Sequence, residues 1–233
     1  MTLTQTPAAA GRVAPSPMAT KVAALAAVLL GLSLFMTVAV IDVPHDPSDQ
    51  ELLNWWHDSV NRWDGVMSGM WALLVAVSIP VVMNHLQRLD AATRSPQWLS
   101  FARSMGAAVT AVWLVTGAAR GTIGHLVDTM NEPLPGTDVL RFSTGLNYTL
   151  LGQSGMAVLA LCILAVSVVV LRTGVFGRWL GYVGAACSAV MLAAVVAQLG
   201  AFTTPLAILW ALCLAVAIWR QPANDPLAVA AVA

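Results

Sequence analysis

Long apolar segments separated by short polar ones set the pattern of this chain. A helix needs about 20 apolar residues to cross the roughly 30 Å hydrocarbon core of a bilayer. Each segment approaches that length, although the last is short and would span only with its flanking residues. The pattern therefore predicts an all-α bundle of six membrane-spanning helices over residues 23–41, 66–83, 105–127, 146–171, 179–199 and 205–219.

A further, shorter helix is predicted between the first two spans. In the segment ELLNWWHDSVNRWDG, apolar side chains recur at helical spacing, namely Leu52, Leu53, Trp56, Val60 and Trp63. Tryptophan favours the boundary between lipid and water. We expect an amphipathic helix in the outer interface, either as a simple anchor for the second span or as a lid over a cavity.

Composition agrees with a membrane domain. Apolar residues make up 58% of the 233 residues and charged residues 9%, whereas soluble domains carry about 25% charged residues. Six spans leave no room for a separate soluble domain. We predict one membrane domain over residues 21–220, a disordered N-terminal segment over residues 1–20, and a C-terminal tail over residues 221–233.

The distribution of charge predicts the orientation. Acidic side chains concentrate in the first and third connections, whereas basic ones flank the bundle and fill the second and fourth connections: Arg12, Lys21, Arg88, Arg94, Arg103, Arg172, Arg178 and Arg220. Short loops rich in Lys and Arg stay cytoplasmic. Both termini are therefore expected in the cytoplasm.

Arg120 is the charged residue that lies deepest in a predicted span. It is expected about two turns, roughly 10 Å, below the outer end of the third helix. An arginine in a membrane is costly and usually faces the bundle interior with a partner. Two interpretations stay open: Arg120 pairs with a carboxylate or reaches the outer surface, or it binds the polar head of a ligand.

Other polar residues are expected at the same depth. Thr116 shares a helical stripe with Arg120, and further polar side chains open the second and fourth spans: Asp64, Ser68, Asn147 and Gln153. This cluster would suit an outward-opening cavity, covered by Trp56 and Trp63. Ordinary hydrogen bonding between helices would produce the same cluster.

Small residues on the third span suggest a close helix contact. Gly117 and Gly121 form a GxxxG pair, which lets another helix approach closely. If this stripe faced lipid, it would favour a structural subunit of a larger membrane complex.

Metal and catalytic signals are weak. His45, His57 and His125 lie on the outer side near carboxylates but lack metal-site spacing, so we predict no metal and no cofactor. For an enzyme acting on an isoprenoid or another lipophilic substrate, the acid would be Asp42 or Asp64, the carboxylates nearest the spans. No basic face exists, which excludes nucleic acid.

Two segments carry a resemblance. The chain is similar to six-helix bacterial integral-membrane proteins grouped as domains of unknown function, through the segments LRTGVFGRWLGYVG and PLAILWALCLAVAIWR. In these proteins a short turn joins the fourth and fifth helices. In this chain the matching turn comprises Thr173, Gly174, Arg178, Trp179, Leu180 and Gly181. The resemblance implies a helical bundle in the bacterial plasma membrane and no catalytic residues.

The leading hypothesis is a membrane protein that binds a lipid or amphiphile, or a partner protein, in the outer half of the bundle. An enzyme and a structural subunit are the alternatives.

Overall fold

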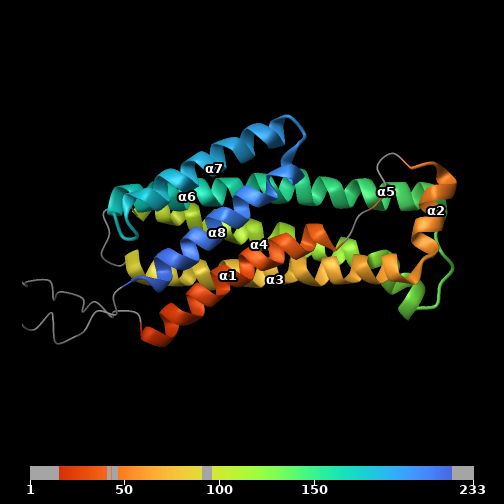
Figure 1. Cartoon of the computed structure of the whole chain (residues 1–233), viewed down its shortest axis with the longest axis horizontal. Coiled ribbons are helices and arrows are strands. Elements are labelled where there is room, and N and C mark those ends of the chain that lie inside the picture. The colour runs from red at the N-terminus through yellow and green to blue at the C-terminus, as the bar shows by residue number, and fades with distance from the viewer. Residues whose placement is uncertain (1–15, 41–42, 44–46, 91–95, 222–233) are drawn as a thin grey trace, which may run out of the picture.

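The computed structural model describes residues 16–40, 43, 47–90 and 96–221, and this part of the chain is helical and contains no strand (Figure 1). Its α-helices are α1 (Pro17–Ala39), α2 (Asp49–His57), α3 (Ser59–Asp90), α4 (Pro96–Gly124), α5 (Thr137–Tyr148), α6 (Met156–Thr173), α7 (Arg178–Val196) and α8 (Thr204–Trp219). Two π-helical segments, η1 (His125–Thr129) and η2 (Thr149–Gly155), and a 3₁₀ turn, η3 (Gly200–Thr203), complete the path.

The predicted number of spans and the all-α class are confirmed. Within the described residues, six helical stretches are long and apolar enough to cross a membrane: Pro17–Ala39, Ser59–Gln87, Gln97–Thr129, Thr137–Thr173, Arg178–Val196 and Gly200–Trp219. The protein is therefore a multi-pass integral membrane protein.

The third connection differs from its prediction. The fourth span was predicted to begin at residue 146, but residues 137–148 form α5, which continues through η2 into α6. Leu140 and Asn147 are buried on one face of α5. Two prolines, Pro133 and Pro135, come just before this helix.

The first connection also differs. The amphipathic helix exists but ends at His57, because Asp58 is extended and its side chain accepts the N–H of Val60 at 2.9 Å. Val60 and Trp63 thus belong to α3. The first span begins at Pro17, capped by Ser16, so residues 17–20 are helical. Residues 1–15, and residues 222–233 of the tail predicted over 221–233, lie outside the described part.

The helices pack around one elongated core. α3 packs along α4, α1 crosses α3 and contacts α8, and α4 packs on α6, which packs on α7 (Figure 1). The core consists mostly of small and branched side chains from α1, α3, α4, α6, α7 and α8, with Trp113 and Trp210 as its largest members. The first turn of α1 and the last turn of α8 lie at one end of the long axis and α2 at the other.

α3 and α4 approach each other closely at glycines. A Cβ on Gly69 would lie 2.6 Å from the carbonyl oxygen of Gly117, and one on Gly117 would lie 2.9 Å from that of Gly69. Any side chain at either position would push the helices apart. The GxxxG residue Gly117 therefore faces a neighbouring helix of this chain.

The turn between α6 and α7 depends on glycines from the predicted motif. Gly174 and Gly177 have φ values of 70° and 81°, in the left-handed region that other residues adopt at a cost. Gly181 packs on α6, since a Cβ there would lie 2.5 Å from Leu171. These motif residues shape a tight turn.

The end of the molecule around α2 reaches beyond the other helices. We call it the α2 extension: α2, α5, and residues 59–66 and 124–129 (Figure 1). The connection between α7 and α8 does not reach it and lies at the level of Gly152, about one helical turn past the end of α5, since a Cβ on Gly200 would overlap the Gly152 carbonyl. The bundle thus has six helices through most of its length and fewer at this end.

Candidate functional site

Arg120 binds the C-terminal end of α1. Its Nη1 donates to the carbonyl oxygen of Thr37 at 2.7 Å and to the hydroxyl of Ser68, which itself donates to the Thr37 carbonyl at 2.7 Å. Thr37 lies in the last turn of α1, where carbonyls lack partners within the helix. A cation is favoured there by the helix dipole, so Arg120 and Ser68 cap α1.

No described carboxylate forms an ion pair with Arg120. The ion pairs found in the described residues are Arg62–Asp128 at 2.6 Å and Arg141–Asp49 at 2.8 Å. Arg120 is only 5% exposed, and its Nε has no hydrogen-bond partner. The expected pairing with a carboxylate is thus replaced, among these residues, by a backbone carbonyl and a hydroxyl.

The depth of Arg120 follows from its neighbours. A Cβ on Gly155 would lie 3.5 Å from the ring of Trp113, so these two residues share a level. Arg120 follows Trp113 by about 10 Å along α4, whereas Gly152 lies about 5 Å from Gly155. Arg120 therefore lies about one turn beyond the connection between α7 and α8, where the shorter helices end.

The remaining polar residues of the predicted cluster lie near this level but do not all meet. Thr116 is buried and donates to the carbonyl of Val112 in its own helix at 2.9 Å. Asn147 is buried with an unpartnered Oδ1. Gln153 is half-buried in η2, and Asp64 is half-buried one turn before Ser68 in α3.

The two tryptophans predicted to cover the cluster go to different places. Trp56 is 1% exposed and packs with Leu52 of α2 against Ile123 and Leu140. The apolar face of α2 is thereby buried against protein. Trp63 is 61% exposed on α3, and it lines a groove on the outer surface of the bundle.

This groove lies between α3 and α4, and we call it the α2-end groove. It has a volume of about 430 Å³. Its floor is formed by small residues of the close helix contact, Gly69, Gly117 and Gly121. Toward the middle of the bundle the lining is apolar, with Met70, Leu73 and Ala118. Toward α2 it includes the polar side chains of His125, Asp128 and Thr129. The remaining lining residues are Val66, Thr122, Gly124, Leu126 and Met130.

Arg62 holds the polar end of the groove in place. Its Nε and Nη2 donate to Asp128 at 2.6–3.1 Å, and its Nη1 donates to the carbonyls of Trp56 and His57 at 2.8 Å. One side chain thus ties the end of α2 to η1. Asp128 remains 41% exposed, which leaves lone pairs of its carboxylate accessible from the groove.

The histidines do not converge on a metal site in the described residues. His57 and His125 are exposed, and His45 and the predicted acid Asp42 lie outside the described part. Among described residues, no three or more His, Cys, Asp or Glu side chains form a group able to hold a metal ion. His125 instead lines the α2-end groove.

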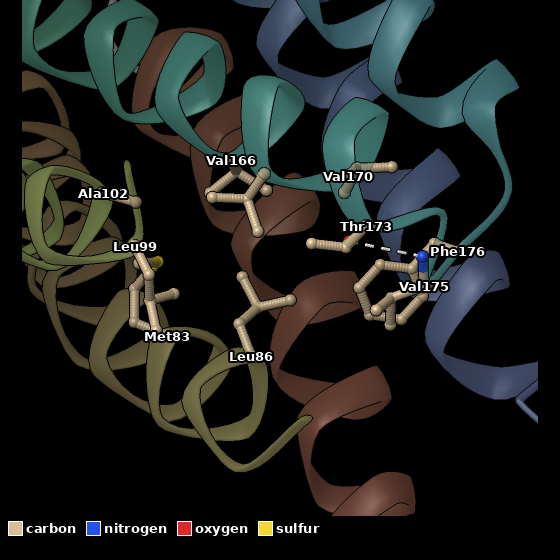
Figure 2. A pocket seen from close by; sticks show the side chains of 10 residues that line it. Met83, Leu86, Leu99, Ala102, Val166, Val170, Thr173, Val175 and Phe176 are labelled. Carbon is tan, nitrogen blue, oxygen red and sulfur yellow. Dashed lines mark hydrogen bonds between the residues drawn. The ribbon is translucent and has the colours of Figure 1, made fainter. Parts of the chain in front are cut away.

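A separate space, shown in Figure 2, is apolar and small. It lies where α3, α4 and α6 meet, near the turn that follows α6, and holds about 20 Å³. That is room for about one water molecule, and a water needs polar partners. Met83, Leu86, Val166 and Phe176 line it, so we interpret it as a packing gap.

Sequence reasoning missed the groove itself. It placed Gly117 and Gly121 on one stripe, but the facing glycine, Gly69, lies 48 positions earlier in a different segment. Gly117 meets Gly69, whereas a Cβ on Gly121 would meet nothing within 4 Å. The sequence offers only the presence of glycines on two apolar segments as a signal. It does not reveal which glycine packs against a neighbouring helix and which one lines a groove.

Comparison with protein-family models, with curated proteins and with solved structures finds no significant match. The resemblance to six-helix membrane proteins therefore stays a prediction, and the function must be argued from the geometry alone.

Proposed function

We propose that this protein binds a lipid or another single amphiphile in the α2-end groove. The observation that carries the proposal is the groove's lining, which is apolar along most of its length and polar at one end. Met70, Leu73 and Ala118 would contact a hydrocarbon chain, and His125 and Asp128 would contact a headgroup. Sites for small ligands combine an apolar lining with a few polar groups in this way.

The position of the groove supports the same function. Leu73 lies within the six-helix part of the bundle, whereas Trp63 and Thr129 belong to the α2 extension. An exposed tryptophan favours the boundary between lipid and water. An amphiphile resting in the membrane would thus have its head and its chain at the right levels.

The polar end favours a headgroup that donates hydrogen bonds. An ionised carboxylate accepts only, a threonine hydroxyl accepts and donates, and a neutral imidazole accepts at one nitrogen. Asp128, Thr129 and His125 together provide these acceptors. A hydroxyl-bearing or ammonium-bearing headgroup would satisfy them.

Orientation enters as part of the proposal. The carboxylate side chains that the structure describes lie toward the α2 end, together with Arg62, Arg120 and Arg141. The other described basic side chains lie toward the opposite end: Lys21, Arg103, Arg172, Arg178 and Arg220. By the rule that basic loops stay cytoplasmic, the groove opens on the outer side of a bacterial plasma membrane.

The alternatives lack a specific observation in their favour. An enzyme would use Asp42, which lies outside the described residues, or Asp64, which is half-buried on α3 and lines neither groove between α3 and α4. A structural subunit would be favoured if the glycine stripe of Gly117 and Gly121 faced lipid. Gly117 instead packs against α3 of the same chain. A partner protein remains open as an occupant of the same groove.

The test uses the protein in lipid nanodiscs with photoactivatable diacylglycerol and phosphatidylethanolamine, each with a diazirine near the headgroup end of its chain. We expect saturable crosslinks within residues 117–130. Gly121→Leu should abolish them, because a side chain there enters open space in the groove. Native mass spectrometry of the gently purified protein should then show one retained amphiphile.

Gly145→Leu is the matched control. A Cβ on Gly145 also meets nothing within 4 Å, but this residue lies on the exposed face of α5 outside the groove. Equal crosslinking of the original protein and both variants would mean that the groove binds nothing specific. A crosslinked protein subunit in place of lipid would favour the partner-protein alternative.

A further inference from the structure

A second groove lies between α3 and α4 near the opposite end of the bundle. It has a volume of about 480 Å³ and lies around Pro80. We call it the basic-end groove. Its lining is polar where it approaches the helix ends, with Asn84, Gln87 and Arg103, and mostly apolar toward the middle of the bundle: Met83, Gly106, Ala107, Thr110, Ala111 and Leu114.

Small residues open the apolar part toward lipid. Ala107 and Ala111 are exposed on the α4 side, one helical turn apart, and Leu114 is 45% exposed. Gly106 lies beneath them, where a Cβ would come within 2.9 Å of the Met83 side chain. The result is an open, mostly apolar stretch of the groove along α4.

The polar part is cationic. Arg103 is exposed and forms no ion pair with any described carboxylate. Asn84 and Gln87 stand on the α3 side of the same groove, one turn apart, and each has an amide NH₂ that donates two hydrogen bonds. Both helices therefore present donors to the same space.

The surroundings add to the positive charge. The charged side chains described near this end, Lys21, Arg172, Arg178 and Arg220, are all basic. Arg172 lies 5.6 Å from the ring centroid of Trp98, one turn before Arg103 along α4. A cationic groove mouth is complementary to an anionic headgroup.

We propose that the basic-end groove binds one phospholipid with a net anionic headgroup. Arg103 contacts the phosphate through its planar fork of donors, Asn84 and Gln87 donate to the remaining headgroup oxygens, and one acyl chain lies along Ala107, Ala111 and Leu114. This site is independent of the α2-end groove, because it lies at the other end of the α3–α4 contact, shares no lining residue with that groove and presents hydrogen-bond donors where that groove presents acceptors.

The experiment measures binding of phosphatidylglycerol to the full-length protein in nanodiscs of phosphatidylcholine, by native mass spectrometry after ejection. The original protein should retain one phosphatidylglycerol in preference to phosphatidylcholine. Arg103→Gln should lower that retention about five-fold or more, as expected for one phosphate-contacting arginine at a membrane surface. Ala107→Trp, which fills the apolar part of the groove, should lower retention of the lipid without removing a charge.

Arg178→Gln is the matched control, because it removes one exposed arginine from the same end but lies outside the groove. It should change retention by less than about two-fold. Equal losses in the two arginine variants would overturn the proposal, since binding would then reflect the general charge of this end. Displacement of the lipid by excess inorganic phosphate would also overturn it, by showing an ion site without a lipid.

Discussion

The hydroxyl of Thr110 on α4 lies 3.3 Å from the carbonyl oxygen of Ala76 on α3 and donates to it. Ala76 is the residue whose helical hydrogen bond would come from position 80, and Pro80 has no N–H. The same hydroxyl also lies 3.1 Å from the carbonyl of Gly106 in its own helix. A neighbouring helix thus satisfies the carbonyl that the proline leaves free, as membrane bundles require.

This contact predicts a coupling between Thr110 and Pro80. Thr110→Val should destabilise the bundle by about 0.6–1.7 kcal/mol, the range of hydrogen bonds between membrane helices. In a Pro80→Ala background the loss should be smaller, because residue 80 then donates to Ala76 itself. Reversible unfolding in mixed micelles measures both. Thr122→Val serves as the control, since Thr122 is exposed and bonds only within α4.

The close contact of α3 and α4 at Gly69 predicts that a larger side chain there destabilises the bundle. Gly69→Ala would place a Cβ 2.6 Å from the backbone oxygen of Gly117, which cannot move alone. We expect a loss of about 1–3 kcal/mol, the usual cost of overpacking, in the free energy of unfolding. Gly145→Ala on exposed α5 meets nothing within 4 Å, and an equal loss there would contradict this account.

Arg120 predicts a link between α4 and the end of α1. Arg120→Met removes the donor to the Thr37 carbonyl while Ser68 stays in place. Hydrogen bonds from charged groups contribute about 1.5–3 kcal/mol, and we expect a loss of this size. Hydrogen exchange of residues 36–40 should quicken.

The same variant also separates the two interpretations of Arg120. Because Arg120 does not line the α2-end groove, amphiphile crosslinking there should persist in a correctly inserted Arg120→Met protein. Crosslinking that disappears while residues 36–40 stay protected would instead identify Arg120 as a headgroup contact. Arg141→Met on exposed α5 is the control for loss of a positive charge at this end.

Glu51 predicts a pH dependence of α2. Hydrogen bonds from the backbone and side chain of Ser48 lower the pKa of the Glu51 carboxyl below its ordinary value of 4.5. A lowered pKa in the folded state means that the capping interaction stabilises α2 fully above about pH 4.5 and is lost as the pH falls through the lowered value. Hydrogen exchange of α2, corrected for intrinsic rates, should therefore quicken in acid.

Glu51→Gln is the matched variant, because glutamine keeps an acceptor for the Ser48 N–H but does not titrate. Its α2 exchange should lose the acid-dependent step attributed to Glu51. An unchanged step in this variant would assign the pH dependence to another carboxyl group.

Several features of the candidate sites could be anticipated from the chain alone. The concentration of polar residues around Arg120 was visible in the spacing of Thr116, Ser68 and Asn147, and Ser68 does meet Arg120. The partner that matters most, the carbonyl of Thr37, carries no side-chain signal. Any residue at the end of α1 offers a carbonyl, so only the packing of α1 against α3 identifies it.

The positions of Trp56 and Trp63 also could not be predicted from the sequence. Trp56 and Trp63 share a helical stripe in the sequence, which predicted one continuous helix. The break at Asp58 separates them into α2 and α3, so Trp56 is buried and Trp63 is exposed. The one extended residue, Asp58, thus changes which side chains of the following helix face the protein interior.

The sequence by itself determined the class of protein, the number of spans and the clustering of charge, because each of these follows from apolar length and from charges that cannot cross a bilayer cheaply. Tertiary structure alone decided that Gly69 and Gly117 meet, that Gly121 stays open, and that Arg120 caps α1. The physical reason is that most faces of all six spans are apolar. Lipid and protein are equally good solvents for such faces, so the choice of neighbours depends on close packing and a few hydrogen bonds.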